Sequence, residues 1–315
     1  MRDLRIIFMG TPDFAVGVLK SLVESGANVV GVITATDKPA GRGRKLRASA
    51  VKQYAESKGL KVLQPKNLKA EEFLEELKSL KANLQIVVAF RMLPKAVWAM
   101  PEYGTFNLHA SLLPEYRGAA PINWAIMNRE EITGVTTFFI DEKIDTGAII
   151  AKKEIEIDNR ETAGSLHDKL MVLGSELVLE TVALIAEGEV ATEVQPSSET
   201  LKEAPKLNNE NLKIDWERTA EKIDAHIRGL NPYPGAWCTL QNNSEELKVK
   251  LFGCDYRIET HNLNPGTVLS SKKEIKVATK DGFVEVYEIQ LPGKRRMTSS
   301  ELLNGYSFEE DAKLL

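Results

Sequence analysis

The sequence predicts an α/β protein of two domains, a doubly wound, parallel-type sheet followed by a smaller β-rich domain. Three observations support this prediction. Short β-branched runs alternate with longer helical patterns over the first half of the 315 residues, as they do in βαβ units. A stretch of linker composition follows. Beyond it, short strand-like runs separated by polar turns are typical of a small β-barrel.

The first domain begins with a strand at residues 4–8 and a helix whose apolar residues recur at helical spacing from Phe14 to Val23. The alternation continues with strands expected at 29–34, 62–63, 84–89, 104–109, 133–140 and 148–157, and with helices expected at 50–57, 70–80 and 162–187. We therefore expect an open, doubly wound sheet. Such sheets bind ligands at the carboxyl ends of their strands.

The apolar periodicity lapses from Val190 to Asn211, where Gln195 and Pro196 precede a serine-rich turn. We place the domains at 1–189 and 209–315, with a linker at 190–208. The second domain should contain a short helix near 219–228 and strands at 236–240, 246–256, 266–269, 274–279 and 282–290. Several short strands with polar turns predict a barrel there.

Hydropathy, net charge and cysteine count exclude several classes of protein. No apolar run approaches the roughly 20 residues that span a bilayer, and the start lacks the apolar core of a signal peptide, so we expect a cytoplasmic protein without a membrane span. The net charge of −4 argues against coating nucleic acid by bulk positive charge. Cys238 and Cys254 are too few for a disulfide framework, and we expect buried or inert thiols.

Asn107 and His109 are the first candidate catalytic residues. They alternate along a predicted strand that ends near Pro114, so they share one face near the strand's carboxyl end. An amide beside an imidazole offers a hydrogen-bond donor for a developing oxyanion and a group that exchanges protons near neutral pH. This pairing favours acyl transfer.

Asp145 lies in a polar loop between two predicted strands, where its carboxylate could reach the imidazole and fix its tautomer and charge. The alternative is structural: Asn107 caps a turn, His109 is a satisfied core histidine and Asp145 is a turn residue beside Gly147. The spacing alone leaves both readings open.

Other kinds of chemistry have weaker support. Ser111 lacks the Gly-x-Ser-x-Gly elbow and neither cysteine is near the histidine, so direct transfer between two substrates is favoured over a covalent intermediate. The remaining histidines lack metal-ligand spacing, and we expect no metal. Gly10-Thr11-Pro12 follows the first strand without a Gly-x-Gly-x-x-Gly pattern, which counts against a nicotinamide cofactor. The turn could contact substrate or only shape the sheet.

Residues 38–47 hold five basic side chains and no acidic one. This glycine-containing loop could bind phosphates or a nucleic-acid end, or it could be a solvated loop. Residues 206–315 hold 16 Lys and Arg against 17 Asp and Glu, a net charge of −1. Any RNA contact there would depend on clusters such as Lys294-Arg295-Arg296.

Several motifs together resemble the methionyl-tRNA formyltransferase family. They include Lys38-Pro39-Ala40-Gly41-Arg42-Gly43, Asn107-Leu108-His109-Ala110-Ser111-Leu112-Leu113-Pro114 with Tyr116-Arg117-Gly118-Ala119-Ala120-Pro121, Asp145-Thr146-Gly147, Ala204-Pro205-Lys206-Leu207, Ile214-Asp215-Trp216 and Ile227-Arg228-Gly229-Leu230-Asn231-Pro232. The Asn-x-His core alone is similar to other enzymes that use formyl-tetrahydrofolate. The basic loop and the C-terminal motifs narrow the resemblance.

The resemblance implies a Rossmann-like formyltransferase fold with an OB-like C-terminal barrel. It implies that 10-formyltetrahydrofolate donates a formyl group to the α-amino group of methionine on initiator tRNA. Asn107 and His109 would stabilise the tetrahedral intermediate, and Asp145 would orient His109 and help proton movement. The folate site would be lined by Ser111, Leu112, Leu113 and Pro114. The barrel would bind the tRNA, and Lys38, Arg42, Arg44 and Lys45 would also contact it.

One departure concerns Arg91, which stands in Ala89-Phe90-Arg91-Met92-Leu93-Pro94 where the family has Ala-Tyr-Gly-x-x-Leu-Pro. Arg91 could contact the folate or face solvent. Two other functions stay open: formylation of a small amine such as a sugar nucleotide, and RNA binding by a chain with an inactive enzyme domain. We expect a monomer.

Overall fold

The computed structural model describes residues 1–40, 45–188, 190–196 and 200–315. These residues fall into two compact units. The first contains 1–118, 133–155 and 167–203, and the second contains 119–132, 156–166 and 204–315. The units therefore interleave along the chain, and the boundaries expected at 189 and 208 stay a prediction.

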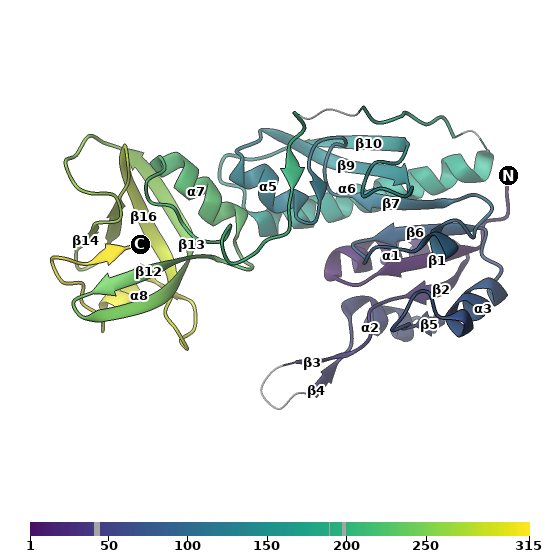
Figure 1. Ribbon diagram of the computed structural model, residues 1–315, viewed down its shortest axis with the longest axis horizontal. Helices are drawn as coiled ribbons and strands as arrows, with labels where there is room; N and C mark the ends of the chain where they lie inside the picture. Colours follow the sequence, from purple (N-terminus) through teal and green to yellow (C-terminus); the bar gives the residue numbers. More distant parts are fainter. Residues whose placement is uncertain (41–44, 189, 197–199) are drawn as a thin grey trace. The chain divides into compact units, whose positions relative to one another are not determined.

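A seven-stranded sheet forms the centre of the first unit (Figure 1), in the order β10-β9-β7-β6-β1-β2-β5. Its strands are β1 (Ile6–Gly10), β2 (Val29–Ile33), β5 (Val62–Leu63), β6 (Leu84–Val88), β7 (Thr105–His109), β9 (Ile132–Phe139) and β10 (Ile149–Glu156). The neighbours from β5 to β7 pair in parallel, whereas β9 pairs antiparallel with β7. The doubly wound sheet is confirmed, with an antiparallel edge.

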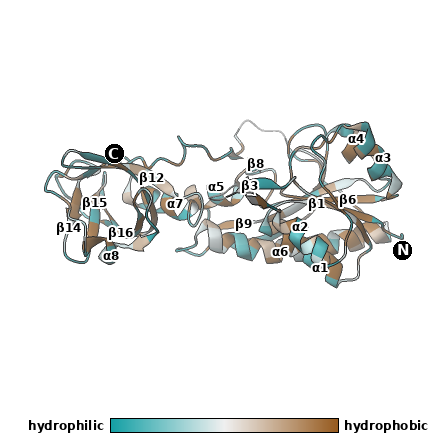
Figure 2. Cartoon of the chain, turned by 90° about the horizontal axis from the view of Figure 1, so that it is seen from below, coloured by the Kyte–Doolittle hydropathy of each residue, from teal (hydrophilic) through white to brown (hydrophobic). Residues whose placement is uncertain are grey.

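Helices of the first unit are α1 (Asp13–Glu24), α2 (Ala50–Ser57), α3 (Glu71–Ser79), α4 (Lys95–Trp98) and most of α6 (Ala163–Glu187). Strands β1 and β6 are entirely buried and largely brown in Figure 2, whereas α1 and α3 carry both colours. This contrast is typical of a sheet covered by amphipathic helices. No helix of the described residues is long and apolar enough to cross a membrane.

Gly10 ends β1 at the turn that lacks the dinucleotide glycines. A Cβ there would lie 2.5 Å from Cβ of Ala15 and 3.0 Å from the carbonyl oxygen of Val88. The first distance is shorter than any contact that a real Cβ makes. Gly10 is therefore required for the close packing of α1 against the sheet, which supports a structural role for this turn.

The second unit contains an antiparallel, nearly closed barrel ordered β14-β15-β16-β13-β12-β18, with β17 beside β16. Its strands are β12 (Ala236–Asn242), β13 (Glu245–Ile258), β14 (Val268–Ser270), β15 (Ile275–Ala278), β16 (Gly282–Gln290), β17 (Met297–Thr298) and β18 (Lys313–Leu314), and α8 is Ser299–Leu303. Leu314 N donates to the Gly266 carbonyl at 2.8 Å, which joins the two ends of the sheet. The predicted barrel is confirmed.

Helices α5 (Pro121–Met127) and α7 (Ala220–Gly229) belong to the second unit. Asn123 Nδ2 donates to the carbonyl of Gly229 at 2.7 Å. Arg160 Nη1 lies 3.0 Å from Oδ1 of Asp224, a fully buried carboxylate. Two segments that precede the expected linker thus pack on α7. Arg160 supplies a donor that the buried carboxylate of Asp224 requires.

Candidate active site

Strand β7 carries Asn107 and His109 on one face of the sheet. Thr105, Asn107 and His109 alternate with Phe106 and Leu108, and successive side chains of a strand point to opposite faces. His109 is the last residue of β7, which runs parallel to β6. The two residues therefore lie toward the carboxyl ends of the parallel strands, where open α/β sheets bind ligands.

His109 is 6% exposed, and both nitrogens of its imidazole face oxygen atoms. Nε2 lies 2.8 Å from the backbone carbonyl oxygen of Tyr116. Nδ1 lies 3.9 Å from Oδ2 of Asp145, which is longer than a hydrogen bond. Because a carbonyl oxygen only accepts, Nε2 carries a hydrogen. An imidazolium, with a second N–H at Nδ1, would also donate toward Asp145.

The loop after β9 holds the carboxylate of Asp145 beside the histidine. Oδ2, the oxygen that faces His109, accepts a hydrogen bond from the backbone N–H of Gly118 at 3.0 Å. Asp145 has a φ of 54°, a strained conformation that persists only where neighbours hold it. At Gly147 a Cβ would lie 1.7 Å from the carbonyl oxygen of Phe139, so only glycine fits. The loop geometry is thus tightly determined.

The side-chain amide of Asn107 is half-buried. Within the described part of the chain, this amide has no hydrogen-bond partner. Its N–H groups are therefore available to a ligand, as an oxyanion donor must be. The structure brings His109 and Asp145 together and places Asn107 on the same strand face. Their catalytic roles stay a prediction.

Sequence reasoning missed the groups that hold the pair. These groups are the carbonyl of Tyr116 and the N–H of Gly118, together with Gln195, which was expected in a linker and contacts the Asp145 loop. Backbone groups carry no side-chain signature. The glycine at 118, with a φ of 124°, is the one local signal that could have indicated them.

Comparison with known proteins identifies the family. Residues 4–182 match the family "Formyl transferase", and residues 206–307 match "Formyl transferase, C-terminal domain". The chain is 59% identical over 314 residues to the methionyl-tRNA formyltransferase of Flavobacterium johnsoniae, with 100% of each chain covered. The chain belongs to the methionyl-tRNA formyltransferase family.

Two solved structures share the fold of this methionyl-tRNA formyltransferase family member. HypX from Aquifex aeolicus, in complex with tetrahydrofolic acid, matches with a TM-score of 0.65 and 21% identity over 96% of this chain and 47% of HypX. The chain thus spans about half of HypX. WlaRD, a sugar 3N-formyl transferase, matches with a TM-score of 0.66 and 20% identity over 94% of this chain and 100% of WlaRD. These similarities confirm the predicted fold.

The segment Ser111–Pro114 divides into buried and accessible residues. Ser111 is fully buried, and its hydroxyl donates to the carbonyl of Glu115 at 2.7 Å. Leu113 is 1% exposed and packs with Phe138 and Ile149. Leu112 and Pro114 are half-buried. A contact with folate stays a prediction for all four residues. Of these, Leu112 and Pro114 have side chains that a ligand can reach.

Arg91 donates to the backbone carbonyls of Pro65 and Lys66, with 3.1 Å between Nη1 and the Lys66 oxygen. Its guanidinium also lies 5.7 Å from the centre of the Phe90 ring. Hydrogen bonds to a charged donor are among the stronger ones. Arg91 therefore braces the chain that follows β5. The side chain is exposed, and of the two expectations for Arg91 the contact with folate stays untested.

The basic stretch contains a short hairpin, β3 (Lys38–Ala40) paired antiparallel with β4 (Lys45–Arg47). Lys38 is exposed at its base. Arg42, Arg44 and the side chain of Lys45 lie outside the described residues. Below the hairpin, Asp37 accepts from Gln64 at 2.8 Å and from Lys52 at 2.7 Å. These two hydrogen bonds hold the pKa of Asp37 below its usual value, so the base of the hairpin is anchored.

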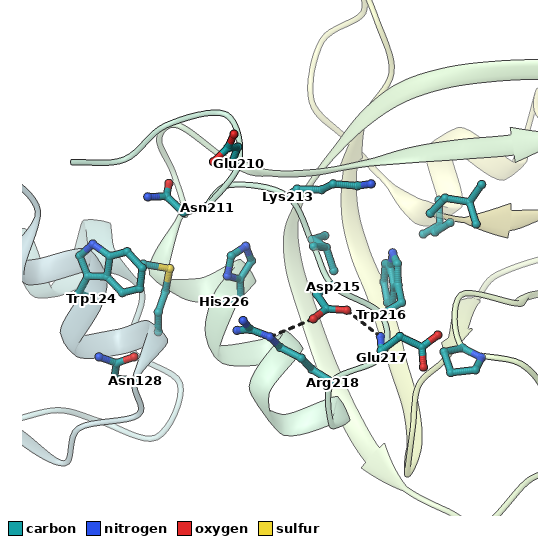
Figure 3. Close-up of a pocket in the computed structure, with 15 residues that line it drawn as sticks. Trp124, Asn128, Glu210, Asn211, Lys213, Asp215, Trp216, Glu217, Arg218 and His226 are labelled. Atoms are coloured by element: carbon teal, nitrogen blue, oxygen red, sulfur yellow. Dashed lines mark hydrogen bonds and ion pairs between the residues drawn. The ribbon is translucent and has the colours of Figure 1, made fainter. Parts of the chain in front are cut away.

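A concave site with a volume of about 570 Å³ lies in the second unit (Figure 3). It is lined by residues that include Trp124, Asp215, Arg218 and His226. Nε2 of His226 is buried without a hydrogen-bond partner. Burial lowers the pKa of His226 to about 4. The imidazole is therefore neutral at pH 7, and the site contains none of the predicted catalytic residues.

The two cysteines are buried and free, as expected. Burial raises the pKa of Cys238 to about 12 and that of Cys254 well above its ordinary value. A thiol with such a pKa is protonated at neutral pH and is a poor nucleophile. Among the described residues, no group of three or more His, Cys, Asp or Glu side chains is placed to hold a metal ion.

Proposed function

We propose that the chain transfers a formyl group from 10-formyltetrahydrofolate to the α-amino group of methionine esterified to initiator tRNA. The observation that carries this proposal is the buried His109 facing Asp145 at the carboxyl end of β7. The amide of Asn107 shares that strand face. Membership of the methionyl-tRNA formyltransferase family supports the choice of donor and acceptor.

The proposed chemistry is an attack of the amine nitrogen on the formyl carbon. The carbon–nitrogen bond to the amine forms, the bond to N10 of the folate breaks, the amine loses a proton and N10 gains one. Asn107 donates a hydrogen bond to the oxygen on which negative charge develops, and His109 stabilises the same charge. Asp145 orients the imidazole and assists the movement of the proton.

Direct transfer is preferred because the described residues offer no activated nucleophile at this site. The hydroxyl of Ser111 is fully buried and donates to a backbone carbonyl. A nucleophilic side chain needs an adjacent base and access to the substrate. The proposed transfer therefore does not pass through an enzyme-bound formyl ester.

Both substrates have proposed contacts. The half-buried Leu112 and Pro114 suit an apolar surface for the folate ring, with Ser111 and Leu113 shaping the turn beneath. Lys38, Arg42, Arg44 and Lys45 would contact the acceptor end of the tRNA, and the barrel would hold the acceptor arm. A monomeric state and a location in the cytoplasm stay predictions.

The test is formylation of charged tRNA by the purified chain. Methionyl-initiator tRNA with 10-formyltetrahydrofolate should be formylated, and methionyl-elongator tRNA should be a much poorer substrate. An amino-sugar nucleotide with the same donor serves as the alternative acceptor. Turnover of the sugar nucleotide without turnover of the charged tRNA would refute the proposed acceptor.

A further inference from the structure

Gln195 lies in the stretch expected to be a linker, yet its side chain is only 8% exposed. Just before it, Glu193 forms a bridge with Ile149 through two backbone hydrogen bonds of 2.8 and 2.9 Å. The segment therefore runs beside the start of β10. This path brings Gln195 to the loop between β9 and β10, which carries Asp145.

The amide of Gln195 has all four of its hydrogen-bonding positions occupied. Nε2 donates to the carbonyl oxygens of Asp145 at 3.0 Å and Gly147 at 2.7 Å. Oε1 accepts from Arg117, at 3.1 Å from Nε and 2.6 Å from Nη2. An amide offers two N–H donors and two acceptor lone pairs. Because Arg117 can only donate, the NH2 group must face the two carbonyls.

The hydrogen bonds of the Gln195 amide form a bridge between two segments, and each segment contacts the candidate catalytic pair. Arg117 stands between Tyr116, whose carbonyl contacts His109, and Gly118, whose N–H contacts Asp145. At the other end, the carbonyls that Gln195 binds flank the turn from residue 145 to 147. The amide therefore ties residues 116–118, which contact both the imidazole and the carboxylate, to the loop that holds the carboxylate.

The strained backbone of Asp145 requires hydrogen bonds such as those of Gln195 to hold it. A residue with a φ of 54° persists only where its surroundings over-determine the backbone. The bonds from Gln195 and Gly118 supply such constraints on both sides of the residue. Without them, the gap of 3.9 Å between His109 and Asp145 would not be fixed.

We propose that Gln195, held by Arg117, is a positioning residue that sets the Asp145 carboxylate against His109. Its effect on turnover rests on the proposed function. Its effect on the geometry of the pair does not. The inference adds a residue from the expected linker to the machinery of the first unit.

The central test is Gln195→Glu, which keeps the shape and the acceptor for Arg117 but replaces both N–H donors with an oxygen facing two carbonyls. We expect kcat to fall by about 10- to 100-fold, because small misplacements of catalytic groups cause losses on that order. The KM values for both substrates should change by less than about twofold. Gln53→Glu, the same change on the exposed face of α2, is the control and should leave kcat unchanged.

A double-mutant cycle separates positioning from general loss of structure. If Gln195 acts through Asp145, Gln195→Glu in an Asp145→Asn background should lower the single-turnover rate by less than about twofold. An equal loss in both backgrounds would overturn the inference. Should Gln195→Glu fail to fold, Arg117→Lys tests the same bridge, because lysine lacks the fork that binds Oε1, and it should reduce kcat in the same direction.

A measurement without turnover completes the design. The chain has 4 histidines, so the imidazole NMR signal of His109 can be assigned with His109→Gln. Gln195→Glu should shift this signal and Gln53→Glu should not. An unchanged signal would contradict the inference even in an active enzyme. If Gln195→Glu shifts the signal but the wild-type chain does not formylate methionyl-tRNA, only the proposed function is contradicted.

Discussion

His109 and His226 are both substantially buried, one in each unit, but their surroundings differ. His109 has a carbonyl oxygen at 2.8 Å from one nitrogen and a carboxylate oxygen at 3.9 Å from the other. His226 has a buried Nε2 with no partner, and burial lowers its pKa to about 4. His109 therefore has an oxygen atom near each ring nitrogen, whereas His226 has a hydrogen bond with the Leu212 backbone at one nitrogen only.

This difference shows that burial alone does not give a histidine a chemical role. Desolvation disfavours the charged imidazole, whereas nearby acceptors favour it. On this comparison His109 is the candidate for the proposed stabilisation of negative charge, and His226 is a structural residue.

The largest expected effect is on turnover by His109→Ala. Removal of the imidazole should lower kcat by about 10³-fold, since loss of one group that stabilises the developing oxyanion costs on that order. The matched variant His226→Ala should lower stability while leaving kcat of the folded protein within about twofold of wild type. Formylation rates measured beside thermal melting curves decide this. Similar rate losses in both variants would break the comparison.

The next effect concerns the stability of the protein at acidic pH. Because the pKa of His226 is about 4 in the folded state against an ordinary 6.5, the unfolded chain binds the proton first as the pH falls. The neutral ring's contribution is fully present above about pH 6.5 and is lost toward pH 4, a change of up to about 3 kcal/mol. Urea unfolding of wild type and His226→Gln measures it. A pH dependence that is identical in both proteins would contradict the prediction.

Asp145→Asn should lower kcat by about 100-fold. The amide keeps the size of the side chain but cannot carry the negative charge that faces Nδ1. The isosteric Asp37→Asn, on a carboxylate below the basic hairpin, should not change kcat, although it can change the use of tRNA. Steady-state formylation with both substrates varied separates these outcomes. An unaltered kcat in Asp145→Asn would remove the carboxylate from the proposed chemistry.

The smallest expected effect is that of Arg42→Ala. Loss of one phosphate contact should raise KM for tRNA by about 10-fold at low salt, with a smaller penalty at high salt. KM for the folate donor should not change. Lys20→Ala, which removes an exposed charge from α1, is the matched control. Equal losses for tRNA and folate would refute this division of roles.

Most strands and long helices follow from the sequence because their apolar spacing is local. The expected helix at 162–187 and the observed one at Ala163–Glu187 differ by one residue. Short elements were missed, including α4, α5, α8 and β18. Helices of 4, 7 and 5 residues and a strand of two residues are too short to establish a period.

The candidate site could be predicted only in part. Asn107 and His109 lie two residues apart on one strand, so the sequence places them together. The contacts of Gln195 reach 50 residues to Asp145 and 78 residues to Arg117. No local pattern reports such pairings, and a single glutamine in a polar stretch has the composition of a linker. Only the tertiary structure brings Gln195 to Asp145 and Arg117.

The interleaving of the two units has a consequence for proteolysis. A single cut between residues 200 and 203 would leave two fragments, and the N-terminal fragment would still carry 119–132 and 156–166, which belong to the second unit. The hydrogen bond from Asn123 to Gly229 and the ion pair of Arg160 with Asp224 would then join different fragments. The nicked protein should therefore copurify as one complex until a denaturant separates its pieces.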